Sequence, residues 1–264
     1  MNLIELNHLF VDDNFFYHSK YLGIVECIYY HEKPNYYSIK VYNKKNLYCI
    51  PSSYMMECYK NKLKYLRMSI LRSKGISNLV HFTVISNLAN VLKNGLLSRN
   101  ILDNENFVYS YSDSIRLDNK LDYICNSITF PNYKMFFAKR QEDVNKKWVV
   151  LSIDSDILVD KFDTEFYRMN AASNDISKCR FNPCSNYALD DMFYPEDREP
   201  NLPSNYTTNP QAEVMIKDSI SSSYIKSIHT NYYDDYVHYL ANNSNLDYDS
   251  NSDLFKPRID YRRW

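Results

Sequence analysis

Alternating apolar and polar residues dominate the first part of the chain. The runs YLGIVECIYY, YYSIKVY and NLYCIP within residues 15–50 predict short strands, because every second side chain of a strand points to the same face. Turn-forming residues separate these runs at positions 33–35 and 43–46. We therefore expect a small β-rich module over residues 1–52.

A helical pattern replaces the alternation from about Ser53 to Ser73. Apolar residues recur there three or four positions apart, as on the buried face of a helix, at Met56, Tyr59, Leu63, Leu66 and Ile70. Basic residues share the same helix, at Lys60, Lys62, Lys64, Arg67, Arg72 and Lys74. We expect a basic connecting helix over residues 53–75, whose charges either lie in solvent or, at Lys60 and Lys64, contact nucleic-acid phosphates.

A mixed pattern of helices and strands follows Gly75. It predicts strands at residues 78–83, 148–154, 211–217 and 224–230, and a helix that begins at Ser86 and stops at Asn94 and Gly95. Residues 171–209 are predicted to form a long polar loop, and such loops in compact domains are usually functional. Residues 241–264 read as a polar linker followed by a basic and aromatic tail.

The composition removes several classes of protein. The chain has 264 residues, of which 45 % are hydrophobic and 24 % are charged, so it is not a disordered chain. With 3 glycines it cannot form the glycine-rich phosphate loop of P-loop and Rossmann proteins. No apolar run approaches the roughly 18 residues of a membrane span, and the start MNLIELNHLF lacks the basic region of a secretory signal.

Charge and cysteine content narrow the interpretation further. The formal net charge is -1, so any basic surface for nucleic acid must be local. The 6 cysteines contain no CxxC pair, which argues against a zinc site and favours reduced thiols in a cytoplasmic protein. The 26 tyrosines reflect either the base composition of the gene or a surface on which bases stack.

Three segments place polar groups at the ends of predicted strands or helices. His81 closes an apolar strand before a helix, which puts its imidazole at the rim of a core. Arg116 lies within the segment SIRLDNKLDYI. Glu213 lies on a strand, where a buried carboxylate is costly unless it is paired or works in a cleft. Each of the three is compatible with a structural role, and spacing alone does not join them.

A family resemblance does join them. The block VHFTVISNLANVLKNGLLS and the distant block YTTNPQAEVMI resemble the DarT family of NAD-dependent, nucleic-acid-modifying ADP-ribosyltransferase toxins. The intervening RLDNKLDYICNSITFPNYKMFF resembles the family's arginine-containing segment, and NAAS at residues 170–173 also fits the family. The resemblance implies an α+β fold over residues 76–240, with a split mixed or antiparallel sheet, flanking helices and NAD in the cleft. The first 75 residues lie outside the family core, and their short strands separately resemble a small SH3-like or Tudor-like barrel.

The resemblance also implies roles for single residues, and no metal. Glu213 would stabilise the oxocarbenium-like ribose and hold its 2′-hydroxyl, because cleavage of NAD resembles glycoside transfer. His81, Thr83 and the main chain at Phe82 would hold the nicotinamide end of NAD, which is the substrate. Arg116 would grip the diphosphate and orient the attacking base, since a guanidinium rarely loses a proton. Two further cleft residues are implied, Asn90 and Ser98.

The implied target is a base in single-stranded nucleic acid, because pairing hides the reactive atoms of a base. DNA is the family default, and RNA stays open because ICNSITFPNYKMFF departs from the usual central segment. The loop before Glu213 supplies candidate contacts, either stacking surfaces and phosphate ligands or ordinary loop packing: Tyr187, Phe193, Tyr194, Tyr206, Arg180 and Arg198. A toxin–antitoxin or phage-defence setting is implied, with an antitoxin partner that is often a macrodomain hydrolase.

Two other functions remain open at the level of sequence. The first is an ADP-ribosyltransferase that modifies a protein side chain. The second is an inactive nucleic-acid-binding module that uses the basic helix at residues 60–74 and the tail at residues 256–264. An intact set of His81, Arg116 and Glu213 favours the enzyme, because a pure binding module need not keep these residues.

Overall fold

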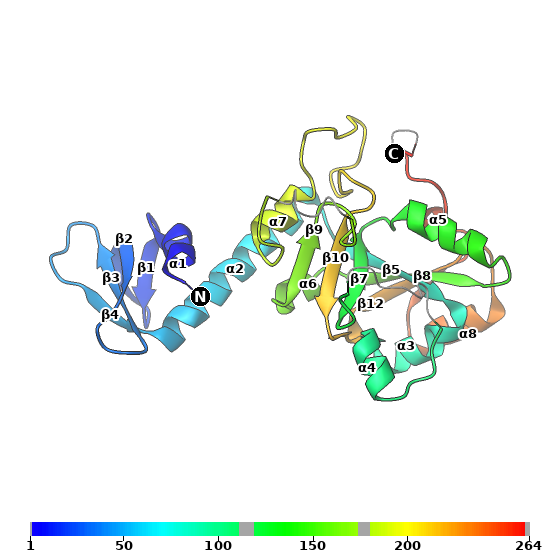
Figure 1. Ribbon diagram of the computed structural model, residues 1–264, viewed down its shortest axis with the longest axis horizontal. Coiled ribbons are helices and arrows are strands. Elements are labelled where there is room, and N and C mark those ends of the chain that lie inside the picture. The colour runs from blue at the N-terminus through cyan, green and yellow to red at the C-terminus, as the bar shows by residue number, and fades with distance from the viewer. Residues whose placement is uncertain (1, 111–118, 174–179, 262–264) are drawn as a thin grey trace. The chain divides into compact units, whose positions relative to one another are not determined.

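The computed structural model describes residues 2–110, 119–173 and 180–261 (Figure 1). The chain divides into two compact units, Met1–Leu66 (unit 1) and Arg67–Trp264 (unit 2). Each unit has its own hydrophobic core.

Unit 1 is a four-stranded antiparallel meander with one short helix. The helix α1 (Leu3–Phe10) precedes β1 (Asn14–Tyr17), β2 (Lys20–Tyr30), β3 (Tyr36–Val41) and β4 (Tyr48–Pro51), which pair in this order. The last three strands match the predicted runs, whereas α1 and β1 were not predicted. In the described residues β1 and β4 form the two edges of the sheet, and the SH3-like description stays a prediction.

The helix α2 (Ser52–Lys74) agrees with the predicted helix to within one residue at each end. Its buried face matches the prediction in part. Tyr59 and Ile70 are partly buried against the two cores as predicted, whereas the fully buried apolar residues are Met55 and Leu71. The prediction that Arg67 belongs to a basic stripe of this helix is wrong, because the residue is only 1 % exposed. Its guanidinium donates hydrogen bonds within unit 2, from Nε to Asn186 Oδ1 at 2.9 Å and from Nη1 to the Leu158 carbonyl at 2.7 Å.

Unit 2 contains a seven-stranded sheet in the order β13-β12-β8-β5-β7-β10-β9. Its strands are β5 (Asn78–Val84), β7 (Tyr123–Ile128), β8 (Trp148–Asp154), β9 (Thr164–Tyr167), β10 (Glu213–Lys217), β12 (Ile225–His229) and β13 (Asp247–Asp249). Neighbouring strands are antiparallel except β12 and β13, which are parallel. A separate two-stranded sheet pairs β6 (Leu96–Leu97) with β11 (Ser219–Ile220). The expected α+β class with a mixed sheet is confirmed.

Helices cover both faces of the large sheet (Figure 1). Apolar residues of α3 (Leu88–Asn94) join the main core on one face, and Phe136 of α5 (Tyr133–Glu142) packs with Val80 and Val150 on the other. The remaining α-helices are α4 (Arg99–Asn104), α6 (Ile157–Asp160), α7 (Asn186–Asp191) and α8 (Asp235–Asn243), and the 3-10 turns are η1 (Ile85–Asn87), η3 (Ser222–Tyr224) and η4 (Asp253–Phe255). In the described part of the chain, no helix combines the length and apolarity that membrane crossing requires.

The predicted linker and basic tail at residues 241–264 are wrong for the described residues. Asp247–Asp249 add β13 to the edge of the large sheet, and the Phe255 ring packs against Phe136 at a centroid distance of 5.1 Å. Arg258 is 2 % exposed, so it is not free to contact nucleic-acid phosphates. Asn, Asp and Ser are typical of tight turns as well as of linkers, which is why composition alone gave the wrong interpretation.

The large sheet is split between β5 and β7. Strand β5 pairs with β8 at every residue from Asn78 to Val84, but its register with β7 covers only Leu79 and Val80. His81 is therefore the first residue of β5 beyond the shared register. The continuation of that register would set His81 opposite Asn126, and the split begins at this point.

Candidate active site

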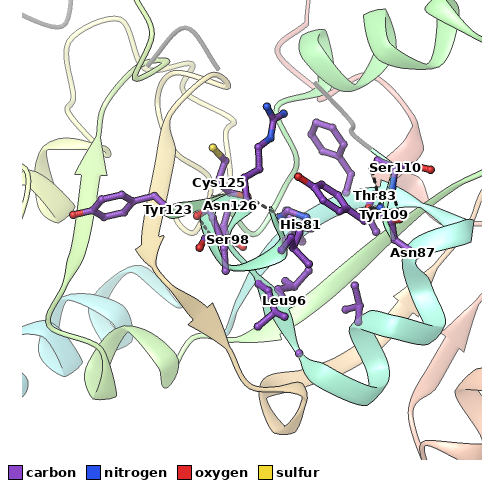
Figure 2. Close-up of a pocket in the computed structure, with 18 of the residues that line it drawn as sticks. His81, Thr83, Asn87, Leu96, Ser98, Tyr109, Ser110, Tyr123, Cys125 and Asn126 are labelled. Carbon is purple, nitrogen blue, oxygen red and sulfur yellow. Dashed lines mark hydrogen bonds between the residues drawn. The ribbon is translucent and has the colours of Figure 1, made fainter. Parts of the chain in front are cut away.

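A cavity of about 290 Å³ occupies the split in the sheet (Figure 2). Its walls come from β5, from α3 and the chain that follows it, from β7, and from the start of α5. Glu213, at the beginning of β10, also lines it. The cavity thus gathers residues that are more than 130 positions apart, from His81 to Glu213.

The wall formed by β5 carries His81, Phe82 and Thr83. The His81 ring reaches across the split, and its Nδ1 lies 2.8 Å from the Cys125 carbonyl of β7. Because a carbonyl only accepts, Nδ1 is the protonated nitrogen in this contact. The Phe82 ring stacks on Phe136 at 4.6 Å.

Thr83 belongs to a hydrogen-bonded corner at the end of β5, drawn with dashed lines in Figure 2. Asn87 Nδ2 donates to Thr83 Oγ1 at 3.0 Å and to the Ser110 carbonyl at 2.9 Å. The Ser110 N–H donates back to Asn87 Oδ1 at 2.9 Å. This corner fixes both the hydroxyl of Thr83 and the chain at Ser110 on the rim of the cavity.

The second wall begins where α3 ends at Gly95. This residue has φ +82°, and a Cβ there would lie 2.3 Å from the Ile220 carbonyl oxygen. Both the backbone conformation and the close approach therefore require glycine. The predicted helix stop at Asn94 and Gly95 is confirmed.

The predicted cleft residues Asn90 and Ser98 both line the cavity but differ in burial. Asn90 lies on the exposed side of α3, and its Nδ2 donates a long bond of 3.4 Å to the Val108 carbonyl. Ser98 is 1 % exposed, and its Oγ has no hydrogen-bond partner among the described residues.

Glu213 is buried at the far side of the cavity with 7 % exposure. Its Oε2 accepts a hydrogen bond from the Ala171 N–H at 2.9 Å, and its Oε1 accepts one from Asn170 Nδ2 at 3.4 Å. These two bonds fix the orientation of the carboxyl group. The short sequence NAAS, which resembles the family, is therefore the segment that holds Glu213.

Comparison with known proteins identifies the family. The sequence model described as "ssDNA thymidine ADP-ribosyltransferase, DarT" matches residues 80–246. The chain belongs to the DarT family. The match covers His81, Thr83, Asn90, Ser98 and Glu213, and it confirms the family that the sequence resembles.

Solved DarT structures resemble the chain at low identity. Thermosipho africanus DarTG in complex with ADP-ribose has 16 % identity and a TM-score of 0.45, over 68 % of this chain and 51 % of that one. Thermus sp. 2.9 DarT with NAD+ has 13 % identity and a TM-score of 0.42, over 68 % and 97 %. The same Thermus protein in complex with ADP-ribosylated ssDNA has 14 % identity and a TM-score of 0.43, over 69 % of this chain and 97 % of that one. The chain thus spans about half of the DarTG chain. No curated protein matches.

Arg116 lies outside the described residues, so its role stays a prediction. Within the described residues, no group of three or more His, Cys, Asp or Glu side chains is arranged to hold a metal ion.

A polar cluster on β9 lies beside Glu213 and was not predicted. Tyr167 is opposite Glu213 in the β9–β10 register, and its hydroxyl donates to Glu165 at 2.5 Å. Lys120 forms an ion pair with the same carboxylate. Burial disfavours the charged form of Glu165, but the hydrogen bonds from Lys120 and Tyr167 outweigh it and hold the pKa of Glu165 below its usual range. The sequence does not predict this cluster, because Lys120 is 45 positions from Glu165, and Glu165 and Tyr167 lie within a strand.

The loop before Glu213 separates the nucleic-acid candidates into two groups. Tyr187 is 52 % exposed and stacks on Phe181 at 5.7 Å, and Arg180 is exposed, so both are accessible. The predicted stacking role of Tyr194 is wrong, because this ring is buried. The guanidinium carbon of Arg168 lies over it, 3.7 Å from the ring centre. Phe193 is buried as well.

Tyr206 and Arg198 hold the loop together instead of facing solvent. The Tyr206 ring packs against Phe130 at 5.5 Å and is half-buried. Arg198 donates from Nη1 to the Tyr206 carbonyl at 2.8 Å and from Nη2 to the Pro203 carbonyl at 2.6 Å. These bonds hold both terminal nitrogens of Arg198 on the loop, and its phosphate contact stays a prediction. In unit 1, Lys60 is exposed and Lys64 is half-buried.

Proposed function

We propose that this DarT protein moves one ADP-ribose from NAD onto a base of single-stranded DNA, with Glu213 as the catalytic carboxylate. The observation that carries the proposal is the position of Glu213 at the split cavity, where Ala171 and Asn170 fix its two oxygens. The family description names single-stranded DNA and thymidine, which supports DNA rather than RNA as the acceptor.

The chemistry suits a buried, oriented carboxylate. When the bond between the ribose C1′ and the nicotinamide nitrogen breaks, nicotinamide leaves with the bonding electrons and the ribose acquires oxocarbenium character. A negative charge that is already in place stabilises this positive charge without reorganisation. The base then forms a new bond to C1′ and releases its proton. Glu213 would also accept a hydrogen bond from the ribose 2′-hydroxyl.

NAD would be held mainly by the β5 wall. His81, Thr83 and the main chain at Phe82 are proposed to contact the nicotinamide end, because these residues line the cavity where β5 leaves β7. Ser98 and Asn90 would contact NAD from the opposite wall. Arg116 is proposed to grip the diphosphate and orient the base on the strength of the family resemblance.

The DNA strand would be contacted from the loop before β10. Tyr187 and Arg180 are accessible and offer a stacking surface and a phosphate ligand. Lys60 and Lys64 are proposed as additional phosphate contacts on α2. For unit 1 we propose an SH3-like module, which the four-stranded meander supports.

The family also suggests a toxin with an antitoxin partner. One of the similar structures is a DarTG protein, which supports pairing with an antitoxin. A macrodomain that removes the ADP-ribose, and a role in phage defence, are proposed on the family resemblance.

Labelled NAD offered with separate pools of single-stranded DNA, RNA and protein tests the proposal. We expect label on DNA, and a loss of about 100-fold or more for Glu213→Gln, because one preorganised charge at a transition state is worth that much. Glu105→Gln, an exposed carboxylate on α4's C-terminal side, is the matched control and should keep full activity. Label found only on protein would support the protein-modifying alternative, and an active Glu213→Gln variant would refute the assigned role.

A further inference from the structure

Three buried side-chain atoms of residues that line the cavity have no hydrogen-bond partner in the described part of the chain: Ser98 Oγ, Asn126 Oδ1 and Asn132 Nδ2. The first two belong to side chains that are 1 % and 3 % exposed. An unpaired polar group that is removed from water costs about 1–3 kcal/mol, so native proteins seldom keep one without a reason. Both side chains line the same cavity, and Figure 2 draws both. This coincidence points to a ligand as the missing partner.

The amide of Asn126 is already oriented by the protein. Its Nδ2 donates to the Ile124 carbonyl at 2.9 Å and to the Val214 carbonyl at 3.4 Å. An amide nitrogen carries two protons, so both donors of this group are used. Oδ1 therefore remains as an acceptor in a fixed direction, and the group that completes it must donate a hydrogen bond.

Ser98 is in a comparable state on the other wall. It is the residue before α4, yet its side chain makes no capping bond to that helix. Its own N–H donates to the Asp218 carbonyl at 2.8 Å, which holds the residue in place while the hydroxyl stays unbonded. A hydroxyl can donate or accept, so Ser98 can serve either kind of ligand group.

The position of Asn126 relates this pair to the reaction. The β5–β7 register ends with Val80 opposite Ser127, so Asn126 is the first β7 residue beyond it and His81 is its counterpart on β5. The carbonyl of the neighbouring Cys125 accepts the hydrogen bond from the His81 ring. On its other side, Asn126 is opposite Val214, the residue after Glu213. Asn126 therefore lies between the proposed nicotinamide site and the catalytic carboxylate.

We propose that Asn126 Oδ1 and Ser98 Oγ bind the nicotinamide riboside half of NAD, with Asn126 accepting a hydrogen bond from it. The donor is either the carboxamide N–H of nicotinamide or a hydroxyl of the adjacent ribose. The inference rests on the proposed function, because it takes NAD as the ligand. Asn126 thereby becomes a residue of the NAD site, and Ser98 is assigned to the nicotinamide riboside half of NAD.

The test measures the Kd of the non-cleavable analogue carba-NAD+ with the full chain and the variants Ser98→Ala and Asn126→Ala. Each variant is expected to raise Kd about 10-fold, which corresponds to about 1.4 kcal/mol. Ser98→Ala removes no hydrogen bond from the ligand-free protein, so its Tm without ligand should be equal to or above that of the unaltered protein. A purely structural role would instead lower Tm and leave Kd unchanged.

Ser155→Ala is the matched control for this measurement. Ser155 is also buried, but its Oγ donates to the Ile76 carbonyl at 3.2 Å and does not line the cavity. Its removal should lower Tm and leave the Kd of carba-NAD+ unchanged. The opposite responses of two buried serines would separate ligand binding from stability.

ADP-ribose and nicotinic acid adenine dinucleotide distinguish the two donors. If the carboxamide is the donor, the variants bind ADP-ribose as the unaltered protein does, and the unaltered protein discriminates against the nicotinic acid analogue. If a ribose hydroxyl is the donor, the variants lose affinity for ADP-ribose as well. Either result supports the proposal.

An unchanged Kd in both variants would overturn the inference. Binding of carba-NAD+ that depends on Ser98 and Asn126, without any transfer to DNA, would refute the proposed function and leave the inference intact. Failure of the unaltered protein to bind carba-NAD+ would refute both.

Discussion

The two sides of β5 differ in how completely they are paired. Toward β8 the register covers the whole strand from Asn78 to Val84, and the β8 residues from Trp148 to Ser152 are buried. Toward β7 the register ends after Val80, and the cavity begins there. One strand thus has a closed seam toward β8, which is fully paired, and an open seam toward β7, which borders the cavity proposed to bind NAD. The comparison predicts that substitutions on the two seams affect different measurements.

The largest effect is expected at Arg258, which holds the loop that precedes Glu213. Arg258 donates from Nη1 to the Thr207 carbonyl at 2.8 Å and from Nη2 to the Thr208 carbonyl at 3.1 Å, and it pairs with the buried Asp260. The loop that it holds leads directly to Glu213. Arg258→Met leaves Asp260 buried without its cation, so we expect the free energy of unfolding to fall by about 3–5 kcal/mol.

Urea denaturation measures this loss, and transfer activity at saturating NAD measures the effect on Glu213. Lys256→Ala on the same segment is the control, because Lys256 is exposed and its ion pair is with Asp253, three residues away. A loss of less than about 1 kcal/mol in Arg258→Met would show that the pair is worth no more than an exposed one.

The next effect tests the closed seam. Leu151 is fully buried in β8, opposite His81 on β5. Leu151→Ala should lower the free energy of unfolding by about 3 kcal/mol, because it removes buried methyl groups and leaves a cavity. The Kd of carba-NAD+ for the remaining folded protein should stay unchanged. A large change in Kd with little loss of stability would contradict the division between the two seams.

A smaller effect on stability, with a larger one on binding, is expected at Thr83 on the open seam. Thr83→Val removes the acceptor of the Asn87 amide, and one such bond contributes about 1 kcal/mol to stability. Because the hydroxyl lies in the proposed NAD site, the KM for NAD should rise about 10-fold, or 1.4 kcal/mol. Ser152→Ala is the control on the closed seam. Equal KM values in Thr83→Val and the unaltered protein would remove Thr83 from the site.

Much of the β5 region could be predicted from its own sequence. The apolar run before His81, the helix after it and the stop at Gly95 are local patterns, and the structure has each of them. The family blocks at both ends of the domain brought Glu213 into the same site. The sequence therefore predicted the fold class and the family, because these depend on local patterns and on blocks that resemble the family.

Contacts between distant segments could not be predicted. The charge of Arg67 and Arg258 favours the surface, and their burial depends on carbonyls that are about 50 or more positions away. Tyr194 is an aromatic loop residue in sequence and becomes a buried ring beneath Arg168 only in the fold. Asn126 is embedded in an apolar stretch, and its unpaired oxygen is evident only once the cavity is formed. These residues follow the tertiary arrangement, which local patterns do not encode.

The smallest effect concerns Glu165 of β9, the strand that pairs with the strand of Glu213. Glu165 receives hydrogen bonds from Lys120 and Tyr167, and its pKa in the folded protein is depressed. The folded protein therefore binds fewer protons than the unfolded chain between the depressed pKa and the ordinary glutamate value of about 4.3. The stability that Glu165 provides is complete above that ordinary value and is lost as the pH falls through the depressed one. Glu165→Gln should consequently be less stable than the unaltered protein at neutral pH, and the difference should shrink as the solution is acidified. Urea denaturation at a series of pH values measures it. A difference that does not depend on pH would mean that Glu165 acts through packing rather than through its charge.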